Sequence, residues 1–178
     1  AAASGQGGGV FYDVKGAVAG GLWRVGGMAS FMGTRATGDG GAVSYEVEAV
    51  QGGSWEIGDD ASFVAGCTCE RDGGAVFYSV VKTVSNSSWS IDGNARFEKA
   101  SSGYEGGAVA YQVGEDVLSG TWQVAGNASF GGCSAAGSFG GSIAFSAFDV
   151  QGGSWSIGGA ATFVDSSTSD YGGGGAYA

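Results

Sequence analysis

The chain has 178 residues, 39 of them glycine, and it contains neither proline nor histidine. Its 17 acidic and 7 basic residues give a net charge of −10 at pH 7, which argues against nucleic acid as a partner and against docking on anionic lipid. The lack of histidine excludes histidine-based acid–base catalysis, catalytic triads that use histidine and histidine-ligated metals. No apolar run approaches the roughly 20 residues of a membrane-spanning helix, so we expect no membrane insertion.

One sequence unit occurs five times along the chain. Half of the unit reads W-x-[VI]-x-x-x-A-x-F without a gap in any copy, and successive tryptophans stand 32 to 34 residues apart. The other half reads G-G-A-[VI]-x-Y-x-V, with substitutions in the first and last copies. The repeated aromatic residues, which we expect to form the core, are Trp23, Trp55, Trp89, Trp122, Trp155, Phe31, Phe63, Phe97, Phe130 and Phe163.

Each unit is predicted to contain three short strands. In the third copy these are Val76–Val80, Trp89–Ile91 and Ala95–Phe97, where the constant residues fall on every second position and therefore share one face. The residues between them vary from copy to copy, which predicts a solvent face. Phe11 and Phe77 occupy this face of the first strand and are candidates for a lateral contact.

Such units can share a core by stacking as coils of a parallel β-solenoid, with equivalent strands about 4.8 Å apart. Stacking explains both the constant spacing and the absence of proline, because a stacked strand that loses an N–H group loses a ladder hydrogen bond. The alternative is a five-bladed, propeller-like ring. We expect an N-terminal extension over residues 1–6 and one solenoid domain over residues 7–178, with about five repeats and the start of a sixth.

The glycine-rich unit also resembles a known class of repeat. The G-G-A-[VI] starts, the Gly126–Phe130 segment and the acidic linkers resemble the repeats of chlamydial polymorphic outer membrane proteins and of some algal surface proteins. The likeness covers Gly7–Ala178. It implies a right-handed parallel β-helix at the cell surface, of the kind found in adhesins and autotransporter passengers, and hence an extracellular or cell-surface location.

The expected geometry indicates a structural, non-enzymatic role. Five coils would stack to a height of only about 25 Å, so both end faces would expose unpaired strand edges and half-buried aromatic rings. No polar capping unit is evident in the sequence, and open edges recruit further strands. The open ends indicate either a slice of a longer repeat array or a chain that stacks head to tail on copies of itself, and on the second alternative we expect a subunit of an extracellular filament or surface layer. The alternatives are an adhesin-like module that binds surface proteins or glycans through its linkers, and a carbohydrate-active β-helix enzyme.

Three acidic residues occupy the same position in successive units: Asp39, Asp72 and Glu105. Stacking would place them about 4.8 Å apart, a column that could bind Ca²⁺ through oxygens or supply the paired carboxylates of a glycoside hydrolase. The simplest interpretation is a solvated acidic turn, and catalysis is disfavoured because no basic residue recurs beside them. Calcium is the one cofactor that the sequence suggests.

The chain has three cysteines, Cys67, Cys69 and Cys133, so at least one cannot pair within the chain. Cys67 and Cys133 fall in equivalent linkers two coils apart, about 10 Å along the axis, whereas a disulfide requires Cα atoms within about 7 Å. A disulfide between subunits and free buried thiols both remain open.

Asn86 and Asn127 match the N-glycosylation acceptor pattern. Asn86 lies in a variable linker and is expected to be the more accessible of the two. Asn127 lies in a tight turn, where an asparagine that adopts a left-handed backbone is the favoured interpretation.

Overall fold

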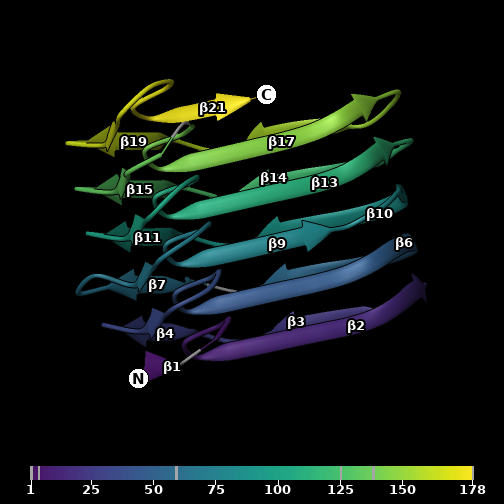
Figure 1. Cartoon of the computed structure of the whole chain (residues 1–178), viewed down its shortest axis with the longest axis horizontal. Helices are drawn as coiled ribbons and strands as arrows, with labels where there is room; N and C mark the ends of the chain where they lie inside the picture. Colours follow the sequence, from purple (N-terminus) through teal and green to yellow (C-terminus); the bar gives the residue numbers. More distant parts are fainter. Residues whose placement is uncertain (1, 4, 59, 125, 138, 178) are drawn as a thin grey trace.

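The computed structural model describes residues 2–3, 5–58, 60–124, 126–137 and 139–177. Strands are the only regular elements among these residues, and every strand pair is parallel (Figure 1). Equivalent residues of successive repeats lie opposite one another, so that Trp89 pairs with Trp55 on one side and with Trp122 on the other. The chain is a parallel β-solenoid of about five coils, which confirms the predicted fold class and excludes the propeller-like ring.

The first two strands of each coil build one ten-stranded sheet. The first strands are β2 (Val10–Ala19), β6 (Val43–Ile57), β9 (Val76–Val80), β13 (Val109–Val117) and β17 (Ile143–Val150). The second strands are β3 (Leu22–Val25), the far half of β6, β10 (Val84–Ile91), β14 (Gly120–Val124) and β18 (Ser154–Ile157). β21 (Gly175–Tyr177) begins a further coil by pairing with β17.

The third strands form a five-stranded sheet of their own. They are β4 (Ser30–Met32), β7 (Ser62–Val64), β11 (Ala95–Glu98), β15 (Ala128–Gly131) and β19 (Ala161–Val164). They carry the phenylalanines of the predicted Ala-x-Phe pairs, which lie in register from coil to coil, as Phe97 does with Phe63 and Phe130.

Each coil adds a fourth strand of two residues beyond the three that the alternation predicts. These strands are β1 (Ala2–Ala3), β5 (Arg35–Ala36), β8 (Thr68–Cys69), β12 (Ser101–Ser102), β16 (Ser134–Ala135) and β20 (Ser167–Thr168), and they form a six-stranded sheet. β1 pairs with β5, so the strand ladder already begins within the segment 1–6 that the sequence assigns to an extension.

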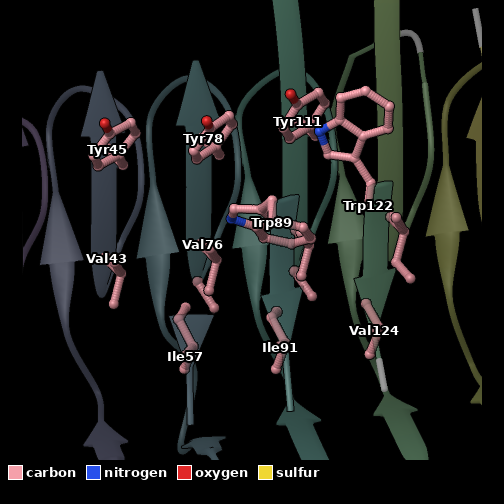
Figure 2. Packing of buried hydrophobic residues seen from close by; sticks show 14 of the residues in the cluster. Val43, Tyr45, Ile57, Val76, Tyr78, Trp89, Ile91, Tyr111, Trp122 and Val124 are labelled. Carbon is pink, nitrogen blue, oxygen red and sulfur yellow. The ribbon is translucent and has the colours of Figure 1, made fainter. Parts of the chain in front are cut away.

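The core consists of aromatic and aliphatic ladders that follow the solenoid axis (Figure 2). Tyrosine rings from Tyr12 to Tyr111 stack with centroids 4.7 to 4.9 Å apart and planes within 8°. The phenylalanine ladder from Phe31 to Phe163 repeats at 4.8 to 5.1 Å. Offset and tilted aromatic pairs contribute about 0.5–1.5 kcal/mol each beyond the burial of their area. The predicted core ladders are confirmed.

The Gly-Gly pair that opens each unit is required by the approach of the next coil. Gly73 has φ +66°, a left-handed backbone conformation that residues other than glycine rarely adopt. A Cβ atom on Gly74 would lie 2.0 Å from the carbonyl oxygen of Gly107. The turn therefore passes so close to its neighbour that no side chain fits at this position.

The outward face of the first strand is not a solvent face in the middle coils. Phe77 is only 4% exposed and Ser44 is fully buried, whereas Phe11 in the first coil is 48% exposed. The Gly-Gly turn folds back over the strand of its own coil, where a Cβ atom on Gly73 would lie 3.0 Å from the Cα atom of Phe77. Phe77 also has a paired strand on both sides, whereas Phe11 pairs on one side only among the described residues. The prediction that Phe77 is available for a lateral contact is wrong.

Candidate functional site

The two end coils differ from the middle coils in what they expose. The inward residues Trp23 and Trp155 are only partly buried, while Trp55, Trp89 and Trp122 between them are buried. A hollow of about 280 Å³ opens between Tyr12 and Trp23 of the first coil and Tyr45 and Trp55 of the second. A smaller hollow of about 130 Å³ lies beside Trp155 in the last coil. Among the described residues, the aromatic core is thus less completely covered in the first and last coils than in the coils between them.

Outward positions of the end coils also carry large apolar side chains. Met28 is 83% exposed at a position that is Asp60, Asn94 and Asn127 in the next three coils. Met32 and Val164 are exposed one residue after the phenylalanine of the first and last coils, at a position that is Glu98 in the third. Exposed apolar side chains at both ends of the described stack are candidates for contacts with a further coil.

Asp39, Asp72 and Glu105 form one column, as their spacing predicts, but they are buried, at 3%, 6% and 8% exposure. The backbone N–H of Asp72 donates to Asp39 Oδ1 at 3.1 Å, and that of Glu105 donates to Asp72 Oδ1 at 2.9 Å. Gln112 Nε2 donates to Asp72 Oδ2 at 3.1 Å, and Gln6 Nε2 donates to Asp39 Oδ2 at the same distance. The interpretation as a solvated acidic turn is wrong, because these carboxylates hold neighbouring turns together.

Burial changes the proton affinity of this acidic column. It raises the pKa of Asp72, against the hydrogen bonds from Glu105 and Gln112, which lower it. Burial also raises the pKa of Glu105, and the neighbouring charge of Asp72 adds to this effect. Both shifts follow from the cost of desolvating a carboxylate.

The acidic column offers little to a calcium ion. Calcium takes six to eight oxygen ligands, whereas the oxygens of Asp39 and Asp72 already accept N–H groups. Within the described part of the chain, no group of three or more Cys, Asp or Glu residues is arranged to hold a metal ion. The geometry assigns the column a structural part in joining coils.

All three cysteines are free and buried. Cys67 and Cys133 are fully buried beneath their linkers, and Cys69 Sγ donates to the carbonyl oxygen of Asp72 at 3.2 Å. Burial raises the pKa of Cys69 to about 12 and also raises that of Cys133, so these thiols form little reactive thiolate. The structure therefore supports free buried thiols over a disulfide between subunits, which would need an exposed sulfur.

The two glycosylation candidates lie in different surroundings. Asn86 is exposed, has φ +49°, and its Oδ1 accepts a hydrogen bond from Ser119 Oγ at 3.0 Å. Asn127 does not take the left-handed conformation predicted for it, because Gly126, with φ +71°, makes that turn. The side chain of Asn127 instead donates from Nδ2 to Asn94 Oδ1 at 3.1 Å, so a glycan on Nδ2 would disturb this bond.

Sequence reasoning missed the polar ladder to which Asn127 belongs. Asn94 Nδ2 donates to Asp60 Oδ1 at 2.8 Å, Asn127 Nδ2 donates to Asn94 Oδ1, and Asn127 Oδ1 accepts the backbone N–H of Ala160 at 3.0 Å. The repeat spacing could have indicated this ladder, since all four residues stand five positions after the tryptophan of their coil.

No family model, no curated protein and no solved structure matches this chain. Among the described residues, no helix is long and apolar enough to cross a membrane.

Proposed function

We propose that this chain is a structural subunit of an extracellular filament or surface layer, in which solenoids stack end to end in a continuous strand ladder. The observation that carries the proposal is the exposed apolar core and outward apolar residues of the two end coils. An open strand edge pairs readily with another strand, and an apolar end face adds a hydrophobic driving force. The occupant that fits best is a second copy, because its first coil has the same cross-section and the same ladder positions.

The register of the two ends supports this head-to-tail contact. In a stack that keeps the repeat in phase, Met32 of one copy lies in the same column as Val164 of the next, and Met28 lies in the column of Ala160. The edge of β17 is occupied by β21, so the strands that end their columns on this side include β21, β18 and β19. Such a contact does not close on itself, so it propagates as a filament.

The adhesin alternative draws no support from the linkers, which are mostly glycine, serine and aspartate. The enzyme alternative is disfavoured by the acidic column, whose carboxylates are buried against N–H donors. The extracellular or cell-surface location belongs to the proposal and rests on the resemblance of the repeats to those of surface proteins.

Sedimentation velocity over a concentration series tests the proposed stacking. The wild-type chain should form larger species as concentration rises, and negative-stain images should show filaments. The double variant Met32→Lys/Val164→Lys places two positive charges in the column where copies meet, and it should remain monomeric. Val81→Lys introduces the same charge at an exposed position of a middle coil and should assemble like the wild type. A wild-type chain that stays monomeric at the highest concentration would contradict the proposal.

A further inference from the structure

An open groove of about 450 Å³ crosses the outer face of the third-strand sheet. It extends over four coils, from β7 through β11 and β15 to β19, and therefore runs along the solenoid axis. Three strand intervals give it a length of about 14 Å. The turn residues on one side of the groove are Asp60, Asn94, Asn127 and Ala160. The outward strand residues on the other side are Ser62, Arg96, Ser129 and Thr162.

The turn side of the groove is fixed in place before any ligand binds. Asp60 Oδ1 accepts both the backbone N–H of Asn94 at 2.9 Å and its Nδ2 at 2.8 Å, and Asn127 continues the ladder. Each asparagine amide carries two N–H donors, and the ladder uses one of them, which leaves a second donor on Asn94 and on Asn127. Groups that are already ordered lose less entropy when they bind a ligand.

The strand side of the groove supplies a hydroxyl group in three of its four coils, and Arg96 takes this position in the other. Ser129 and Thr162 are exposed neighbours in paired strands, and Ser62 stands two coils before Ser129. A hydroxyl both donates and accepts hydrogen bonds.

The charges along the groove leave it close to neutral. The lining residues include one acid, Asp60, and one base, Arg96. Arg96 is held by Glu98, whose Oε1 accepts a hydrogen bond from Arg96 Nε at 3.0 Å. With a net charge of −10 on the whole chain, an anionic ligand would be repelled. The groove thus presents donors and acceptors with one carboxylate at its end, that of Asp60, whose Oδ1 accepts two N–H groups of Asn94.

We propose that this groove binds a linear, neutral polysaccharide laid along the solenoid axis. A sugar chain in extended form advances by close to one strand spacing per residue, so successive units meet at least one polar side chain in every coil of the groove. Sugar hydroxyls donate and accept, as the two sides of the groove do. A peptide in this position would cross the strands instead of adding to an edge, so its backbone would find no ladder to join. This binding function is separate from end-to-end stacking and does not depend on it.

Isothermal titration calorimetry with four neutral hexasaccharides tests the proposal: cellohexaose, laminarihexaose, maltohexaose and chitohexaose. At least one should bind, and Ser129→Tyr, which fills the middle of the groove, should weaken that affinity by at least about tenfold. Ser156→Tyr is the matched control, since Ser156 is an exposed outward serine of β18 outside the groove, and it should bind like the wild type.

Thermal melting of both variants establishes that they are folded, and Thr162→Tyr replaces Ser129→Tyr if the latter is not. Two results would overturn the proposal. One is the absence of binding to all four sugars at millimolar concentration, and the other is an unchanged affinity in a folded groove variant.

Discussion

Replacing one phenylalanine of the stacked ladder by alanine should destabilise the protein much more in a middle coil than in the last coil. Phe97 is fully buried, and its ring stacks at 4.8 Å on Phe63 and at 4.9 Å on Phe130. Replacement of a buried phenylalanine by alanine typically costs 3–5 kcal/mol, and with two stacked partners we expect about 4 kcal/mol for Phe97→Ala. Phe163 is 37% exposed and stacks on Phe130 at 4.9 Å. For Phe163→Ala we expect about 2 kcal/mol, because Phe163 buries less area and stacks on one ring instead of two.

Urea unfolding followed by tryptophan fluorescence, at a concentration where the chain is monomeric, measures both changes. The difference between the two variants is the informative quantity, since both remove the same atoms. Equal losses would refute the reasoning, because they would mean that the last coil is covered as completely as the middle ones.

Three further predictions concern the turns, the acidic column and the thiols. Gly74→Ala should destabilise the fold by about 3 kcal/mol or prevent folding, because its Cβ atom would meet a backbone oxygen. Ala65→Gly should stabilise the fold by about 0.5–1 kcal/mol, because Ala65 has a left-handed backbone with φ +58°. Chemical denaturation measures both changes, and a stable Gly74→Ala chain would refute the turn geometry. In the folded chain the pKa values of Asp72 and Glu105 lie above their ordinary values of 3.8 and 4.5, so these groups oppose folding at neutral pH, and stability returns as pH falls through the raised values. The variant Asp72→Asn/Glu105→Gln should therefore melt higher than the wild type at pH 7 and lose this advantage toward pH 4; the opposite trend would show that the charged forms are stabilised. Native thiols should react with a thiol reagent only on the timescale of unfolding, and rapid reaction of any cysteine would contradict its burial.

The strand ladders could be predicted because like residues recur at a nearly constant interval, and this interval alone specifies which residues stack. Trp55, Trp89 and Trp122 lie directly over one another for this reason. The burial of Phe77 could not be predicted from alternation, because it depends on the path of a glycine turn across the strand. A period of two identifies the two faces of a strand but does not show what covers each face.

The candidate sites were predicted less completely than the fold. The column of Asp39 and Asp72 follows from the repeat, but its burial depends on hydrogen bonds between coils that composition does not reveal. The fourth strand of each coil could not be predicted, because two residues are too few to show an alternation of buried and exposed positions. The ladder through Asn94 was missed because asparagine in a turn is usually explained by its own backbone rather than by the coil above.

Fibre diffraction from aligned assemblies of the purified chain tests the end-to-end stacking most directly. Solenoids that continue one another's ladders should give a reflection near 4.8 Å along the filament axis, because every strand lies perpendicular to that axis. A reflection at this spacing perpendicular to the filament axis, or a chain that forms no filaments at any concentration, would contradict the proposed assembly.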